Sequence, residues 1–288
     1  IFRWVTLLLM WVGLPWVSGS EDSKVRCIAD GCMRSPYMAS FTLEQAIGVS
    51  LTNYYYYPHR VSLTDDEMER YAELSLKIAR LMNRDDDEGQ NALKMLLIRR
   101  AELLNKAKNK LGVLSALIDN QSHIEHTLFY CAPGQIDEAL HLLAYEKGLR
   151  VMRFTAEEDA KTRQQLLKSF AEGDLQALVA MKCLDEGVDV PGTRTAYFLA
   201  SSGNPREFIQ RRGRILRRAP GKDYANIYDL VAVPPTIVGN NSPSFEAERS
   251  IMRRELQRFK EFANPALNKQ QAIDVVWDIA KNYSLMGF

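Results

Sequence analysis

The sequence predicts an α/β protein built on a parallel sheet with helices on both faces. Between His126 and Val233, short apolar runs rich in β-branched and aromatic residues alternate with segments of helical periodicity. Several runs are continuously apolar, as strands buried on both faces of a sheet should be. The alternation indicates βαβ units. The chain has 288 residues, of which 46% are hydrophobic and 25% charged, which suits about two globular domains.

The predicted elements follow one another in order along this segment. Strands are expected at Thr127–Cys131, Val151–Phe154, Gln176–Ala180, Thr195–Ala200 and Ala225–Val231. Helices are expected between them at Gln135–Glu146, Glu157–Ala171 and Arg206–Leu216. Together they make one α/β domain of about 110 residues, a common domain size.

The segment before this domain contains long helices. Thr64 and Glu67 have the spacing of a capping box, and apolar residues then recur at helical intervals, which predicts a helix over Asp65–Met82. A second long helix is expected from Ala92 to about Asn120, with a weak point at Gly112.

The pattern divides the chain into four parts: residues 1–40, which match no motif, residues 41–122 with the long helices, the α/β domain over residues 123–235, and a helical extension over residues 236–288. Four adjacent tyrosines, Tyr54–Tyr57, are expected to form an extended strand or a linker that packs on a domain. The chain starts at Ile1 rather than Met, which suggests a piece of a longer protein.

The apolar run Trp4–Val17 has three readings: a secretory signal, a buried strand of a truncated domain, or sequence foreign to this protein. It is shorter than the about 20 residues of a membrane-spanning helix. Four cysteines are too few for a disulfide scaffold. We therefore expect a cytoplasmic protein with no membrane partner, and a secreted or membrane-anchored protein is the alternative.

Residues with functional chemistry follow two of the predicted strands, at the sheet edge where ligands of parallel sheets bind. Between Arg194 and Lys222 there are eight Lys or Arg residues and one acid. Gln210, Arg214 and Arg217 share one face of the helix expected there, and paired guanidiniums suit phosphate oxygens. The alternative is an ordinary solvated basic helix.

These residues carry a resemblance to superfamily 2 helicases. Gln210-x-x-Gly213-Arg214-x-x-Arg217 resembles motif VI, the run Glu186–Pro191 resembles motif V, and Thr127–Cys131 resembles the motif IV strand, followed by a helix with Arg163, Phe170 and Gly173. The likeness covers about residues 123–233, which correspond to the second RecA-like domain. Residues 41–82 are similar to the interdomain connector of bacterial DEAD/DEAH-type helicases allied to restriction-enzyme and excision-repair motors.

The resemblance implies roles for the matching positions. Arg214 and Arg217 would reach the ATP phosphates, one of them as an arginine finger. Gly187, Asp189 and Gln210 would organise the nucleotide cleft and link it to the nucleic-acid groove. Thr155, Ser201 and Ser202 would contact the sugar–phosphate backbone.

Two of these positions carry alternatives. Thr155 and Glu158 also have capping-box spacing, which is a purely structural reading. Where many relatives have a motif V threonine this chain has Met181, so a hydroxyl contact is not expected there.

No phosphate-binding loop of the form G-x-x-x-x-G-K-[ST] occurs in the chain. Asp185 and Glu186 lie beyond the strand end and do not suit a magnesium motif, and no other metal site is expected. We interpret the chain as the C-terminal motor domain of an ATP-dependent DNA helicase or translocase, inactive alone. ATP and Mg²⁺ would be held largely by a missing N-terminal RecA-like domain. The alternative is a stand-alone nucleic-acid-binding or regulatory module without ATPase activity.

Overall fold

The computed structural model describes residues 46–82, 86–181, 190, 192–200, 213, 215–233, 249, 252–253, 256 and 259–286. The chain divides into two units, and the first ends at Leu51. The described part of the first unit is a turn closed by a bridge between Ile47 and Leu51. The second unit starts at Thr52.

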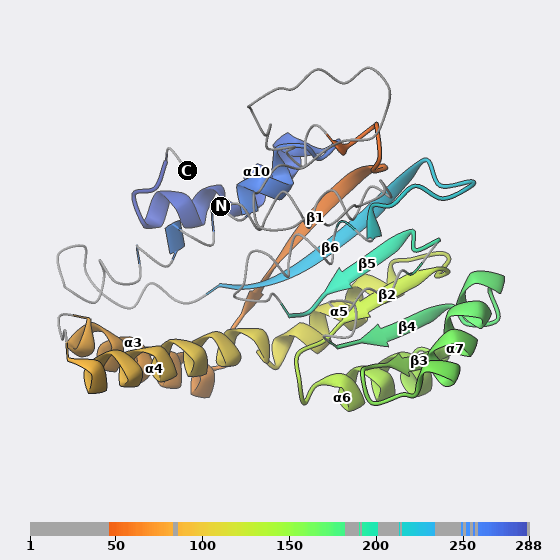
Figure 1. The fold of residues 1–288 in the computed structure, drawn as a ribbon. Helices are drawn as coiled ribbons and strands as arrows, with labels where there is room; N and C mark the ends of the chain where they lie inside the picture. The colour runs from red at the N-terminus through yellow and green to blue at the C-terminus, as the bar shows by residue number, and fades with distance from the viewer. Residues whose placement is uncertain are drawn as a thin grey trace, which may run out of the picture. The chain divides into compact units, whose positions relative to one another are not determined.

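The second unit is built on a six-stranded sheet in which every pair of neighbouring strands is parallel (Figure 1). Across the sheet the order is β1 (Asn53–Ser62), β6 (Tyr224–Val233), β5 (Thr195–Phe198), β2 (Thr127–Tyr130), β4 (Ala177–Ala180) and β3 (Val151–Phe154). The predicted α/β architecture is confirmed. All five strands expected after residue 123 are present, with bounds that shift by at most two residues.

The sixth strand, β1, contains the four tyrosines and pairs with β6 along its whole length. Its outer edge is occupied by the C-terminal segment. The Tyr56 N–H donates to Asn268 Oδ1 (2.8 Å), and Asn268 Nδ2 donates to the Tyr56 carbonyl (2.9 Å). The backbone of alternate strand residues faces the same side, so Pro58 also turns its nitrogen outward and costs the sheet no hydrogen bond. The strand alternative for the tyrosines is therefore confirmed.

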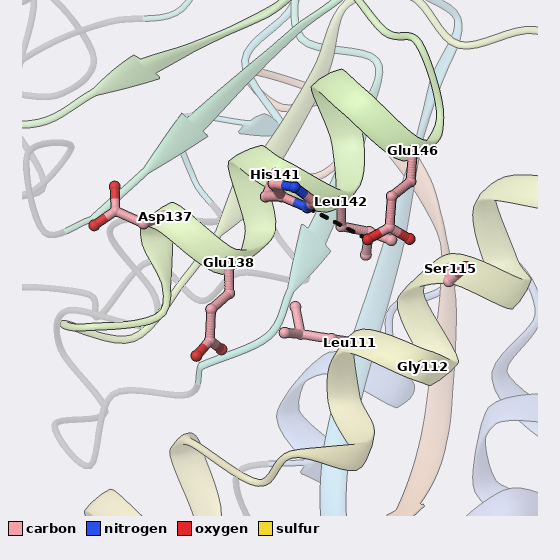
Figure 2. Close-up of a pocket in the computed structure, with 8 residues that line it drawn as sticks. All are labelled: Leu111, Gly112, Ser115, Asp137, Glu138, His141, Leu142 and Glu146. Carbon is pink, nitrogen blue, oxygen red and sulfur yellow. Dashed lines mark ion pairs between the residues drawn. The ribbon is translucent and has the colours of Figure 1, made fainter.

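The helices in chain order are α3 (Asp65–Leu81), α4 (Asp87–Asn105), α5 (Asn109–Asp119), α6 (Ile136–Leu140), the π-helix η1 (His141–Glu146), α7 (Ala160–Glu172) and α10 (Lys269–Asn282). Buried residues of α5, α6 and η1 form one cluster with Phe129 and Tyr197 of the sheet. A groove of about 590 Å³ lies between α5 and α6–η1 (Figure 2). The crossover from β2 to β3 moves outward across the sheet, and the crossover from β3 to β4 moves back. Because both crossovers are expected to be right-handed, α7 lies on the face opposite to α6 and η1.

An aromatic row crosses the cluster side of the sheet. Phe129, Tyr197, Tyr228 and Tyr57 are register partners on β2, β5, β6 and β1. Consecutive rings stack with centroids 5.0, 4.5 and 5.0 Å apart. The row joins four strands through side-chain packing in addition to their backbone hydrogen bonds.

The prediction of one continuous helix from Ala92 to Asn120 is wrong. The chain forms two helices that separate at residues 106–108, whereas Gly112 lies inside α5. The physical reason is Glu67 of α3. Its Oε2 accepts from the Thr64 N–H, completing the predicted capping box, and its Oε1 accepts from the Lys108 N–H, each at 3.0 Å. One buried carboxylate therefore stabilises the starts of two helices.

Replacing Glu67 with alanine is expected to lower the free energy of unfolding by about 2 to 3 kcal/mol, because two backbone N–H groups lose a charged acceptor in a buried site. Urea denaturation followed by circular dichroism measures the change. Glu67→Gln should lie between the wild type and Glu67→Ala. Glu69→Ala, an exposed position on the same helix, should change stability by less than about 0.5 kcal/mol. Equal effects at both positions would contradict this account.

The helix predicted over Gln135–Glu146 is present but divided. It is α-helical from Ile136 and changes to π-helical geometry at His141. The helix predicted from Glu157 begins later, since Asp159 is the N-cap of α7 and accepts from the Thr162 N–H at 2.7 Å. Gly173, with φ of +84°, ends this helix in the left-handed conformation.

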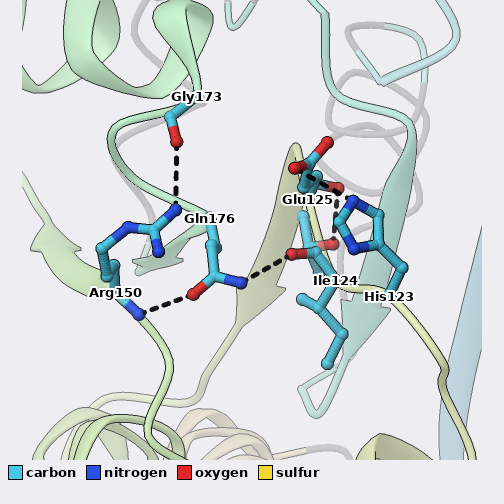
Figure 3. Close-up of polar contacts among 7 residues, drawn as sticks. His123, Ile124, Glu125, Arg150, Gly173 and Gln176 are labelled. Atoms are coloured by element: carbon cyan, nitrogen blue, oxygen red, sulfur yellow. Dashed lines mark hydrogen bonds and ion pairs between the residues drawn. The ribbon is translucent and has the colours of Figure 1, made fainter.

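The amino-terminal edge of the sheet is held together by Gln176 (Figure 3). Its Oε1 accepts from the Arg150 N–H (3.0 Å), and its Nε2 donates to the Ile124 carbonyl (3.1 Å). The Arg150 guanidinium donates to the carbonyls of Gly173 and Asp174. These bonds connect the segments that enter β2, β3 and β4.

Candidate nucleotide and nucleic-acid site

The carboxyl edge of the sheet is formed by the ends of β2, β4 and β5. Backbone pairing continues just past the strands: the Cys131 N–H donates to the Ala180 carbonyl (3.0 Å) and the Leu199 N–H to the Tyr130 carbonyl (2.8 Å). Beyond these bonds the chain leaves the sheet. The described residues at this edge belong to the loop after β2, the residue after β3, and the junction of α4 and α5.

Lys110, near the start of α5, is buried beneath this edge with 2% of its surface exposed. Its Nζ donates to the Leu199 carbonyl at the end of β5 (2.5 Å) and to the Asn105 carbonyl (3.2 Å). Burial raises the pKa of the neighbouring Cys131 thiol to about 12, against the opposing charge of Lys110. The thiol is therefore uncharged at neutral pH, and the ammonium fastens α5 to the end of β5.

The loop after β2 turns at Gly134, whose φ of +87° is the left-handed conformation that glycine tolerates. A Cβ at this position would lie 3.8 Å from Lys106 Nζ, so the exposed ammonium and the turn are adjacent. The next residue, Gln135, is 4% exposed, and its Oε1 has no hydrogen-bond partner among the described residues. This part of the edge offers the Lys106 ammonium to an anion.

Thr155, one of the predicted backbone-contacting residues, lies directly after β3 and is 1% exposed. Its N–H and hydroxyl both donate to Glu158 Oε2, at 2.5 and 2.8 Å, and the hydroxyl accepts from the Glu157 N–H (3.2 Å). The hydroxyl is therefore engaged within the turn that leads to α7. The contacts between Thr155 and Glu158 are those of the predicted capping box. They form in the turn before α7, whose N-cap is Asp159.

Arg217 is half-buried and follows the helical residues Gly213 and Ile215. It therefore lies past the last helical residue described, not on the helix itself. Lys222 Nζ donates to the carbonyls of Ile215 and Arg217, which holds this turn in place. Arg218 is exposed. The remaining predicted site residues lie outside the described residues: Gly187, Asp189, Ser201, Ser202, Gln210 and Arg214.

Met181, at the end of β4, is partly buried and packs against the apolar cluster. Its side chain therefore contributes to the core. The sequence analysis missed Lys106, Lys110 and Gln135. Lys110 was detectable in principle, because it shares a helix face with the buried residues Leu114 and Ile118.

Among the residues that the structure describes, no helix is long and apolar enough to cross a membrane. No three His, Cys, Asp or Glu side chains within those same residues come together as a metal site.

Residues 109–219 match the family of the helicase conserved C-terminal domain. The chain is 27% identical over 202 residues to the DNA 3'-5' translocase XPB2 of Sulfurisphaera tokodaii, covering 64% of this chain and 44% of the relative. It is also 22% identical over 161 residues to IRC3 of Saccharomyces cerevisiae, which is provisionally described as an ATP-dependent helicase. This match covers 54% of this chain and 23% of the relative. The chain thus spans less than half the length of either relative.

Solved structures similar to this chain include the following two. The C-terminal domain of the DEAD-box protein Dbp5 is 20% identical, with a TM-score of 0.38, and the match covers 51% of this chain and 78% of that one. The C-terminal part of the Fun30 ATPase domain is 13% identical, with a TM-score of 0.43, and the match covers 63% of this chain and 86% of that one.

The described fold is a parallel α/β sheet with helices on both faces, the architecture expected of a RecA-like domain. More narrowly, residues 109–219 are similar to the helicase conserved C-terminal domain, a match that covers less than half of the chain. The resemblance to bacterial DEAD/DEAH-type motors stays a prediction.

Proposed function

We propose that this chain is the C-terminal motor domain of an ATP-dependent DNA translocase or helicase. The observation that carries the proposal is the match of residues 109–219 to the helicase C-terminal domain. The name of the Sulfurisphaera relative supports DNA as the nucleic acid. The whole enzyme would need a first RecA-like domain, which contributes the phosphate-binding loop that this sequence lacks.

In this proposal the carboxyl edge faces the phosphates of both ligands. Arg217 and Arg214 would direct guanidiniums at the ATP phosphates, one as the arginine finger. Gly187, Asp189 and Gln210 would shape the nucleotide cleft. Ser201 and Ser202 would contact the DNA backbone with the Lys106–Gly134 turn, and Thr155 would do so if its turn opens.

The described residues fit the ATP phosphates better than they fit Mg²⁺. Arg217 supplies a guanidinium, although its turn is bonded beside the starts of β1 and β6 through Leu216 and Lys222. No group of three acidic or histidine side chains converges among the described residues. The ligands of Mg²⁺ would therefore come mainly from the first domain. Bound Mg²⁺ would neutralise phosphate charge, and Arg217 would stabilise the charge that develops during phosphoryl transfer.

The test is single-stranded DNA binding by this chain, measured by fluorescence anisotropy across a salt series. We expect weak binding that is indifferent to sequence and falls steeply with salt, because backbone contacts release counterions. Lys106→Ala should reduce affinity and lower the salt slope by about 0.7, the value for one phosphate contact of a single strand.

Lys94→Ala is the matched control, because this exposed lysine lies on α4 three turns before Lys106. It should bind as the wild type does. Affinity that does not change between low and moderate salt would contradict the proposed backbone contacts and favour a module that does not bind nucleic acid.

A further inference from the structure

The groove between α5 and α6–η1 begins close to the carboxyl edge, because Leu111 follows Lys110 and Asp137 lies two residues after Gln135. It has an apolar floor with a charged rim (Figure 2). Leu142, 7% exposed, and the partly buried Leu111 form the floor and belong to the apolar cluster beneath it. The other lining residues are Gly112, Ser115, Asp137, Glu138, His141 and Glu146. The two walls are helices, so the groove has the shape that would receive a third helix.

The charge of the rim is of one sign. Three carboxylates and one imidazole line the groove, and no lysine or arginine does. Asp137 forms an ion pair with Arg153, and Glu146 Oε1 lies 3.4 Å from His141 Nδ1. Glu138 has no ion-pair partner among the described residues. The rim would therefore attract a cationic ligand and repel the phosphates of a nucleic acid.

Gly112 provides an independent observation. It lies inside α5, where glycine is among the least favourable residues, and no positive φ requires it. A Cβ built there meets no atom within 4 Å. Packing within this chain therefore gives no reason for a glycine at this position. A close-approaching ligand in the groove would give one.

The upper wall of the groove has two further unusual features. Residues His141–Glu146 form a π-helix, a rare geometry that is frequent at functional sites. Tyr145 of this segment is 81% exposed, and its ring lies 5.3 Å from that of His141. A large exposed aromatic side chain next to His141 of the rim is typical of protein interfaces.

We propose that this groove docks a short basic amphipathic helix of a protein partner. Leucine-like side chains of the helix would cover Leu111 and Leu142, and its backbone would approach α5 at Gly112. Lysine or arginine side chains would pair with Glu138 and Glu146 on the rim. The 11 residues of α5 rise about 16 Å, which matches about three turns of the docked helix.

The test uses the full chain and a fluorescein-labelled peptide of about 12 residues, with leucines on one helical face and lysines beside them. A peptide of the same composition in scrambled order is the specificity control. We expect saturable binding of the amphipathic peptide that is at least tenfold tighter than binding of the scrambled one. Glu138→Lys with Glu146→Lys should weaken it about tenfold, because two attractive contacts become repulsive.

Glu69→Lys with Glu157→Lys is the matched control, since it changes the net charge equally at exposed sites outside the groove. Equal loss in both double variants would overturn the proposal, because attraction to overall charge would explain it. Equal affinity for both peptides would also overturn it.

Gly112→Leu separates binding from folding. The leucine replaces glycine inside a helix and enters open space, so the melting temperature should rise by about 2 °C. Peptide binding should nevertheless fall at least tenfold, because the side chain fills the groove. A Gly112→Leu protein that is folded and binds the peptide as the wild type does would exclude this groove as the docking site.

Discussion

Arg217→Ala is expected to lower ATP turnover by about 10³-fold or more in a two-domain enzyme that joins this chain to the first RecA-like domain of a relative. An arginine finger acts on the charge that develops in the transition state, so the affinity for ATP should change much less than turnover. Arg217→Lys should fail nearly as badly, because an ammonium does not reproduce the planar fork of a guanidinium. Steady-state hydrolysis and nucleotide binding measure the two effects separately.

Arg218 provides the control, because it is adjacent and exposed whereas Arg217 is half-buried. Arg218→Ala should retain most of the turnover. A folded Arg217→Ala enzyme with near wild-type turnover would remove Arg217 from the proposed mechanism. Arg214 would then be the next arginine to test.

Phe129→Ala is expected to lower the free energy of unfolding by about 3 to 5 kcal/mol. Phe129 is fully buried in the middle of the sheet, and its ring stacks on that of Tyr197 with centroids 5.0 Å apart. Removing the ring opens a cavity between the sheet and the helices above it. Thermal unfolding followed by circular dichroism should show a fall of about 10 °C in the midpoint.

Tyr197→Phe tests the same aromatic row by removing a hydroxyl while keeping the ring. The Tyr197 hydroxyl is buried, has no hydrogen-bond partner among the described residues, and has a pKa raised by burial. Removing it leaves the stacking intact and relieves an unsatisfied polar group, so stability should stay within about 1 kcal/mol of wild type or increase. A loss as large as that of Phe129→Ala would mean that the hydroxyl, not the ring, stabilises the row.

The strands and the first long helix could be predicted because their signals are local. Buried parallel strands are continuously apolar, and the capping box at Thr64 and Glu67 marks the start of α3 within three residues. Tertiary contacts decided the rest. The break before α5 depends on Glu67, 41 positions earlier than Lys108, and no local pattern at residues 106–108 reports it. Gly112 appeared to be the weak point because propensity alone was considered.

The site was predictable to a smaller degree. The order of motif-like residues indicated the carboxyl edge, yet the buried cation at that edge, Lys110, comes from a helix placed outside the α/β domain by the sequence pattern. Similarly, Thr155 fitted a phosphate contact and a capping box equally well in sequence. Only the position of Glu158 shows which partner its hydroxyl has in this structure.

The ten-residue pairing of β1 with β6 has a mechanical consequence. The segment that resembles an interdomain connector is built into the sheet, and Asn268 fastens its outer edge. Such a segment cannot act as a flexible tether, because bending it would break the sheet. β1 therefore moves with the sheet as one body, and any motion relative to β6 would have to break ten residues of pairing.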